Sequence, residues 1–182
     1  MRMKLYVFVL LGLGLSIVSC KKEAPKHGVP PSEQVVSDLN ETKTNESVKF
    51  ANKNQDLLYT DYLAIKAALV NTNSMKTQTA ANRMANDLKT VSEFKNARQV
   101  AVLISKEKDI EKQREFFVGL TSEVFKLIDG NITEGKVFQQ MCPMAFDGKG
   151  GVWLSDSNEV RNPYFGDVML ACGAVMNIFE KK

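Results

Sequence analysis

Apolar residues recur at spacings of three and four through the middle of the chain. Such spacing places side chains on one face of an amphipathic helix. The first such stripe is followed by similar stripes at residues 79–94, 100–104 and 110–128. Asp109 is suited to cap the helix predicted from the last of them. Four antiparallel helices with short connections are the simplest packing for these lengths, so we predict a mainly α fold with an up-down four-helix-bundle-like core. The first stripe consists of Leu58, Tyr62, Ile65 and Leu69.

The pattern changes after the fourth predicted helix. Residues 137–142 look extended, residues 147–151 are rich in glycine, and residues 152–154 are again apolar. This order predicts a small β-hairpin insert. Gly166 and Asp167 then offer a helix start, so we expect residues 168–179 to form a C-terminal helix.

The first nineteen residues have the pattern of a bacterial lipoprotein signal peptide. A cationic start is followed by an apolar stretch, residues 5–18, that is too short and glycine-interrupted for a spanning helix. The run Ile17-Val18-Ser19-Cys20 resembles the lipobox at which lipoprotein signal peptidase cuts. We therefore expect Cys20 to carry acyl chains such as palmitate and to anchor the mature protein to a membrane.

The domain plan follows from these patterns. Residues 20–54 are polar and rich in Lys, Pro, Thr and Asn, which is typical of a flexible tether. The remainder is long enough for one ordinary domain with its own core. We predict a signal peptide at 1–19, a tether at 20–54, and a helical domain at 55–182 that carries a C-terminal cysteine and methionine motif.

Charge and histidine content exclude several classes of function. Loss of the signal peptide removes two cationic residues and lowers the formal charge from +3 to +1, which is no nucleic-acid signature. The single histidine, His27, lies in the predicted tether, so the domain lacks the usual general base and zinc ligand. No serine sits in a nucleophile elbow. We expect no enzymatic activity.

Two cysteines remain for the domain once the lipid has taken Cys20. Thiolates and thioethers without histidine or carboxylate favour Cu(I) or Ag(I) over zinc, calcium or magnesium. An oxidising compartment also favours a structural disulfide, and a buried apolar stripe of the expected helix is a third interpretation. The residues alone leave all three open. The candidate donors are Cys142, Met144, Met169 and Cys172, with Met141 and Met176 as weaker candidates.

Linked short motifs occupy the C-terminal part of the chain. They are Cys142-Pro143-Met144, Trp153-Leu154-Ser155, the run 161–166 and Met169-Leu170-Ala171-Cys172-Gly173. With residues 62–70 and 113–117 they resemble a domain-of-unknown-function family of small exported lipoproteins. The same module is appended to periplasmic adaptor subunits of copper- and silver-type heavy-metal efflux pumps. The resemblance runs from about residue 56 to the C-terminus, implies metal handling by association, and carries over Cys142, Met144, Met169 and Cys172.

The expected function combines these features. We expect a lipoprotein of the cell envelope, anchored to the outer membrane on its periplasmic or surface face, that binds Cu(I) or Ag(I) for metal efflux or homeostasis. Its expected partners are the membrane and components of a heavy-metal efflux pump, and nucleic acid is not among them. The alternative is a structural or adaptor lipoprotein with a Cys142–Cys172 disulfide and no metal.

Overall fold

The computed structural model describes residues 37–128 and 130–182. The predicted signal peptide at 1–19, the predicted lipidation site Cys20 and the first part of the predicted tether, residues 20–36, lie outside the described residues. Within the described part, no helix combines the length and the apolar character needed to cross a membrane.

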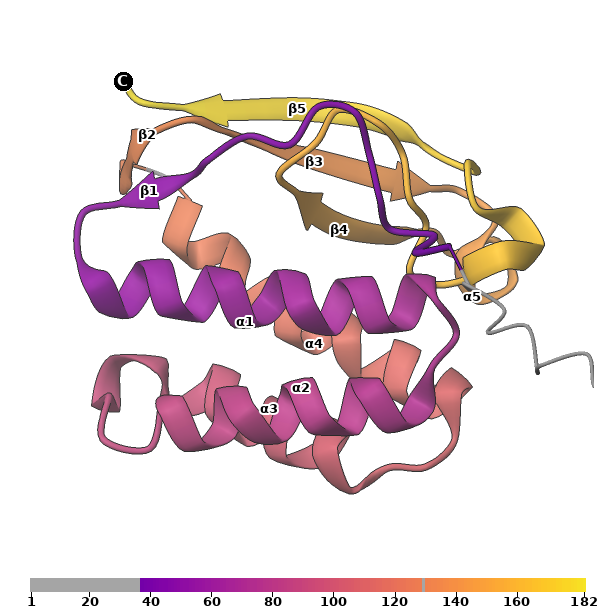
Figure 1. The fold of residues 1–182 in the computed structure, drawn as a ribbon, viewed down its shortest axis with the longest axis horizontal. Helices are drawn as coiled ribbons and strands as arrows, with labels where there is room; N and C mark the ends of the chain where they lie inside the picture. The colour runs from indigo at the N-terminus through magenta and orange to yellow at the C-terminus, as the bar shows by residue number, and fades with distance from the viewer. Residues whose placement is uncertain (1–36, 129) are drawn as a thin grey trace, which may run out of the picture. The chain divides into compact units, whose positions relative to one another are not determined.

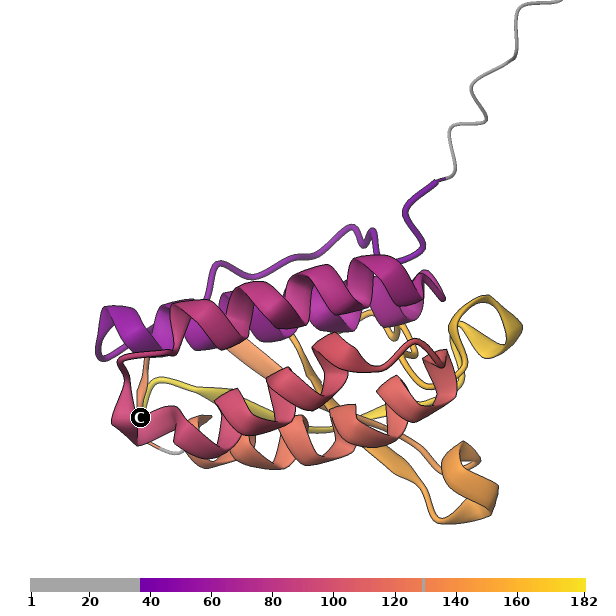
Figure 2. The ribbon, with the colours of Figure 1, turned by 90° about the horizontal axis from the view of Figure 1, so that it is seen from below.

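Four helices follow one another along the chain, in the order predicted from the apolar stripes. They are α1 (Lys53–Val70), α2 (Ser74–Asp87), α3 (Lys95–Lys106) and α4 (Ile110–Ile128). The Asn52 side chain caps α1, and the Asp109 carboxylate accepts a hydrogen bond from the Glu111 N–H (2.9 Å) at the start of α4, as expected. Each helix packs on the next, and α4 packs back on α1 (Figures 1 and 2). The prediction of a mainly helical chain is confirmed.

The second helix differs from its predicted range of 79–94. It starts earlier because the Asn73 side chain accepts a hydrogen bond from the Lys76 N–H (2.9 Å). It ends at Asp87, and Phe94 instead belongs to the 3₁₀ turn η1 (Ser92–Phe94). Phe94 is still buried in the core. Apolar residues therefore continue at helix-like spacing beyond the end of α2, which is why the predicted range was too long.

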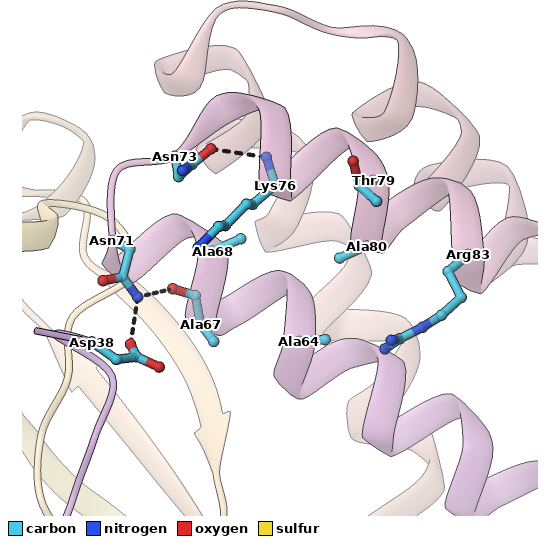
Figure 3. A pocket seen from close by; sticks show the side chains of 10 residues that line it. All are labelled: Asp38, Ala64, Ala67, Ala68, Asn71, Asn73, Lys76, Thr79, Ala80 and Arg83. Carbon is cyan, nitrogen blue, oxygen red and sulfur yellow. Dashed lines mark hydrogen bonds between the residues drawn. The ribbon is translucent and has the colours of Figure 1, made fainter. Parts of the chain in front are cut away.

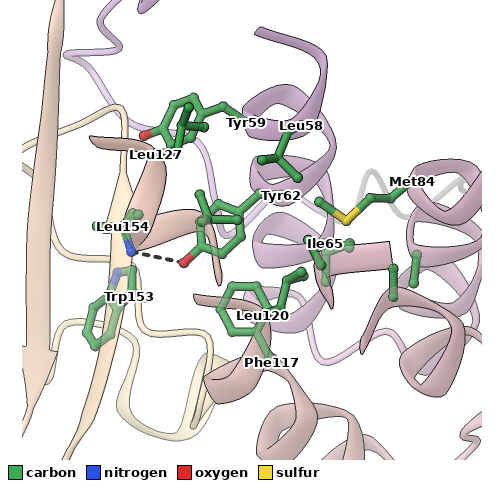
Figure 4. Packing of buried hydrophobic residues seen from close by; sticks show 14 of the residues in the cluster. Leu58, Tyr59, Tyr62, Ile65, Met84, Phe117, Leu120, Leu127, Trp153 and Leu154 are labelled. Atoms are coloured by element: carbon green, nitrogen blue, oxygen red, sulfur yellow. Dashed lines mark hydrogen bonds between the residues drawn. The ribbon is translucent and has the colours of Figure 1, made fainter. Parts of the chain in front are cut away.

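The core between the helices and the sheet is centred on Tyr62 of α1 (Figure 4). Its ring stacks on Phe117 of α4, with centroids 4.9 Å apart. Its hydroxyl accepts a hydrogen bond from the Leu154 backbone N–H (3.0 Å). Met84 of α2 is fully buried in the same core, where it packs among the apolar side chains.

A small antiparallel sheet lies beside α1 and α4 (Figure 1). The predicted hairpin is confirmed, because its two strands pair from Phe138 with Ser155 to Cys142 with Gly151. The turn between them contains the short helix α5 (Ala145–Gly148). Strand order in the three-stranded sheet is β4-β3-β5, and β1 pairs with β2 separately. The strands are β1 (Lys49–Phe50), β2 (Ile132–Glu134), β3 (Lys136–Cys142), β4 (Gly151–Ser155) and β5 (Ala174–Glu180).

The predicted C-terminal helix at 168–179 is wrong. Residues Gly166–Met169 form the 3₁₀ turn η2, and β5 pairs antiparallel with β3 on the side opposite to β4. Val175, Ile178 and Phe179 are β-branched or aromatic and suit a strand, and β3 offers them a free edge. The period of a short apolar run does not distinguish helix from strand. Met169, Cys172 and Met176 therefore do not share one face of a helix.

The predicted end of the tether at residue 54 is also wrong, because residues 38–50 pack on the domain. The Phe50 side chain is only 5% exposed, and its ring lies 5.2 Å from that of Tyr59. The Lys43 N–H donates to a Glu159 carboxylate oxygen (2.8 Å). A polar segment can dock through its backbone and one buried aromatic ring, which average composition does not reveal.

Candidate soft-metal centre

Cys142 and Cys172 meet at one end of the three-stranded sheet. Cys142 is the last residue of β3 and is fully buried, whereas Cys172 lies just before β5 and is half-buried. Their Sγ atoms are 2.8 Å apart, although 30 positions separate them in the sequence. Both are free cysteines. The two predicted thiol donors thus form one site with a buried sulfur and a sulfur near the surface.

The pairing of β3 with β5 brings these thiols together. Met141, next to Cys142, stands opposite Ala174 in the register of the two strands. Between them the chain passes so close that a Cβ atom on Gly173 would lie 2.9 Å from the Met141 carbonyl oxygen. Gly173 also has a φ of +142°, which side chains rarely adopt. Glycine is therefore required for β5 to approach β3 beside the cysteine pair.

Buried aromatic and amide side chains surround the inner side of the site. Trp153 is fully buried, and its indole N–H donates to the Gln140 side-chain oxygen (2.7 Å). The Tyr164 ring meets the Trp153 ring edge-on, with centroids 5.8 Å apart. The Asn162 side-chain amide donates to the Cys172 carbonyl (2.9 Å). In such a dry environment a thiolate is unfavourable unless a cation compensates its charge.

The electrostatics of the pair favour protonated thiols. The pKa of the Cys172 thiol is raised above its ordinary value, chiefly because it shares a hydrogen bond with the Cys142 thiol. Partial desolvation and the proximity of the Cys142 charge add to this effect. A thiol with a raised pKa is a poor nucleophile at neutral pH. Binding of a metal ion would have to displace its proton.

The predicted methionines are not gathered around the thiols. Met144 is 57% exposed and Met176 is 58% exposed, so both thioethers are largely open to solvent. Met169 is half-buried at the end of η2. Met141 precedes Cys142 in β3, and adjacent side chains of a strand point to opposite faces. The structure therefore brings together the two cysteines but does not assemble the full predicted set of donors.

Comparison with known families identifies the helical half of the chain. The model of a family described as "Protein of unknown function (DUF3347)" matches residues 58–135, from α1 to just beyond β2. This segment is therefore similar to a domain-of-unknown-function family. The expected family resemblance is confirmed for it, while Cys142 and Cys172 lie beyond the matched residues. Comparison with curated proteins and with solved structures gave no match.

A groove of about 610 Å³ lies between α1 and α2, and most of the residues that line it fall in the segment matched by the DUF3347 model (Figure 3). Alanines of α1 and α2 line it, with Lys76 and Arg83 among its polar residues. The Arg83 guanidinium pairs with the buried Asp61 carboxylate (2.7 Å). None of the six sulfur candidates lines this groove. Across the described residues, no group of three or more His, Cys, Asp or Glu side chains is arranged to hold a metal ion.

Sequence reasoning missed the amides that support the thiol pair. The sequence points to Asn162 only as part of the run 161–166, yet its side chain is fully buried and contacts the Cys172 backbone. Gln140 is also fully buried, and its amide donates to the Ser157 carbonyl (2.9 Å). A polar residue inside the apolar run 137–142 was a signal for a buried hydrogen-bonding role.

Proposed function

We propose that this protein is a lipid-anchored protein of the cell envelope that binds Cu(I) or Ag(I) through Cys142 and Cys172. The observation that carries the proposal is the 2.8 Å contact between the two Sγ atoms, one buried and one half-buried. The ion would be the cargo of a protein that serves metal efflux or homeostasis. We assign it no catalytic role.

The chemistry of the site fits a soft monovalent ion. Two thiolates supply negative charge and soft donors, and the sequence contains no histidine after His27. A metal–thiolate bond is ~2.3 Å long in protein sites, so an ion held between the sulfurs requires them to move apart. The Cys172 side chain would make this adjustment by rotating its sulfur, because it is half-buried and lies outside the strands. Met144 lies two residues beyond Cys142 and is exposed, so its thioether is available as an additional donor from the solvent side.

The wider setting of the site is also a proposal. Lipid on Cys20 would hold the domain at the outer membrane, on its periplasmic or surface face, and a component of a heavy-metal efflux pump would receive the ion. The four helices would act as an up-down four-helix-bundle-like scaffold that carries the sheet and the thiol pair. Support comes from the lipobox-like run at residues 17–20 and from the family resemblance.

A second function is favoured by the same contact. Sulfur atoms in a disulfide are ~2.05 Å apart, so a pair at 2.8 Å is close to forming that bond. In an oxidising envelope the protein would then be a structural or adaptor lipoprotein with a Cys142–Cys172 disulfide and no metal. The two functions are distinguished by whether the reduced protein binds Cu(I).

Competition with a Cu(I) chelator tests the proposed metal site. The reduced protein is expected to retain about one Cu(I) per chain, and oxidation of the pair should abolish binding. Cys142→Ser or Cys172→Ser should weaken binding by about tenfold or more, since a thiolate contributes charge, whereas Met144→Leu should have a smaller effect. Binding should also weaken as pH falls, because protons compete for sulfurs whose thiol pKa is raised at Cys172.

Met75→Leu is the matched control for the methionine variant. Met75 is 75% exposed at the start of α2, so its replacement should leave the affinity for Cu(I) unchanged. A reduced wild-type protein that loses all Cu(I) to the chelator would reject the metal function and leave the disulfide function in place.

A further inference from the structure

Every polar group of Asn162 is used to close the loop that leads to Cys172. Its side-chain amide donates to the Cys172 carbonyl (2.9 Å), and its backbone N–H donates to the Leu170 carbonyl (2.8 Å). Its side-chain oxygen accepts from the Tyr164 N–H (2.8 Å), and its carbonyl accepts from the Gly166 N–H (3.0 Å). Asn162 is fully buried. One residue thus holds both ends of the loop at 163–171.

These bonds fix the backbone on both sides of Ala171. The Leu170 and Cys172 carbonyls are both held by Asn162, two residues apart. Immediately after Cys172, the close approach of Gly173 to the Met141 carbonyl fixes the chain against β3. Cys172 is therefore held from the loop side by Asn162 and from the strand side by β3. Both restraints hold the Cys172 backbone near the end of β3, where Cys142 lies.

We propose that Asn162 is a positioning residue for the thiol pair, and that its bond to the Cys172 carbonyl sets the effective concentration of one thiol toward the other. A thiol confined near its partner reacts in an effectively unimolecular step, so loss of the restraint lowers that concentration. The same restraint would set the affinity for a soft ion, and this second consequence rests on the proposed function. The positioning of the thiols themselves does not require a metal.

The tyrosine beside Asn162 provides a control with a different expectation. The Tyr164 hydroxyl donates to the Val152 carbonyl (2.6 Å) in the same buried region, but this bond does not reach Cys172. Tyr164→Phe should therefore lower overall stability without changing the relation between the thiols. Asn162→Ser keeps a hydroxyl that can accept from the Tyr164 N–H, and is too short to reach the Cys172 carbonyl. The serine variant thus removes mainly the bond of interest.

Equilibration of the full chain with glutathione buffers, without metal, tests the proposal. Oxidation forms one Cys142–Cys172 bond and reduces one glutathione disulfide to two glutathione thiols, so the equilibrium constant measures the effective concentration of the pair. Asn162→Ser should lower this constant by about tenfold, which corresponds to a shift of about 30 mV. Tyr164→Phe should change it by less than about twofold. Thiol trapping and mass spectrometry of the Cys142–Cys172 peptides give the ratio.

Three results would overturn the proposal. The first is an equilibrium constant for oxidation that is unchanged in Asn162→Ser. The second is a decrease of this constant in Tyr164→Phe as large as the decrease in Asn162→Ser. The third is a decrease of this constant that, across the variants, is proportional to their decrease in melting temperature. If Asn162→Ser does not fold, Asn162→Asp serves instead, because its carboxylate accepts from the Tyr164 N–H but cannot donate to the Cys172 carbonyl when ionised. Cu(I) competition by the same variants is scored separately, so that failure of the metal function leaves the redox result standing.

Discussion

Lys66 shows how one residue can carry a charge into the interior of this domain. It lies in α1, is 2% exposed, and donates hydrogen bonds to the side-chain oxygens of Asn40 (3.1 Å) and Ser155 (3.2 Å). Burial lowers its pKa from 10.5 to about 8, and the nearby Asp156 carboxylate opposes that shift. Because the pKa in the folded state is below the unfolded value, the unfolded chain binds more protons between these two pH values. Folding is therefore less favourable at pH 8 than at higher pH.

Replacement of Lys66 should remove this pH dependence. Between pH 8 and 9.5 the free energy of unfolding of the wild type should rise by roughly 1.5 kcal/mol on account of Lys66. Lys66→Met should lack that increment, while Lys112→Met, at an exposed position of α4, should keep it. Urea titrations of the reduced protein at the two pH values measure the difference. Equal increments in the wild type and Lys66→Met would show that Lys66 is not the group responsible.

At the scale of elements, local periodicity was informative where an element is packed along one face. The helices α1 and α4 repeat apolar residues every three or four positions, because each buries one stripe against the core. β5 follows no such rule, because its place depends on the distant edge of β3 and on the approach permitted by Gly173. β1 has only two residues, too few for any period to be read. Strand partners far away in the chain were thus beyond sequence reasoning.

β1 offers a direct test that the segment before α1 belongs to the domain. The Phe50 backbone N–H donates to the Asp56 carboxylate (2.8 Å), and its ring packs edge-on against Tyr59. Phe50→Ala should therefore cost about 3 kcal/mol of unfolding free energy, the range for a buried aromatic truncation. Lys49→Ala, at the exposed neighbouring position, should cost far less. Urea unfolding monitored by Trp153 fluorescence decides, and a near-neutral Phe50→Ala would restore the view that a flexible tether extends to residue 54.

For the molecule as a whole, the sequence pointed to the two cysteines of the candidate site but only partly to its geometry. The expected export and the number of cysteines pointed to Cys142 and Cys172 as a potential pair, since the cysteines of exported proteins tend to form disulfides. The predicted helix at 168–179, which would have placed Met169 and Met176 beside Cys172, does not form, so the spacing of these two methionines carried no information about distance. The residues that fix the pair, Asn162 and Gly173, act through backbone contacts between distant segments. Such contacts leave no periodic trace in a sequence.

The proposed membrane anchor and the proposed metal site lie in different parts of the chain. A single substitution should therefore abolish one of them without affecting the other. Cys20 precedes the described residues, and Cys142 lies 122 positions beyond it at the end of β3. Acyl chains contribute membrane affinity in proportion to their length, ~0.8 kcal/mol per methylene group, and no described helix could supply it instead. Cys20→Ala should therefore abolish incorporation of a labelled fatty acid and the cut before residue 20. Its purified domain should still hold Cu(I) as the wild type does.

Cys142→Ser should give the converse result, with normal lipid labelling and membrane recovery but weakened Cu(I) binding. Mass spectrometry of the mature N-terminus, fractionation of membranes and chelator competition provide the three measurements for both variants. A Cys20→Ala protein that is still cut at the same bond and still recovered with the membrane would remove the lipid anchor from the proposal. Loss of Cu(I) binding in a folded Cys20→Ala protein would instead mean that Cys20 itself is a metal ligand, because the thiol pair in the domain is unchanged by that substitution.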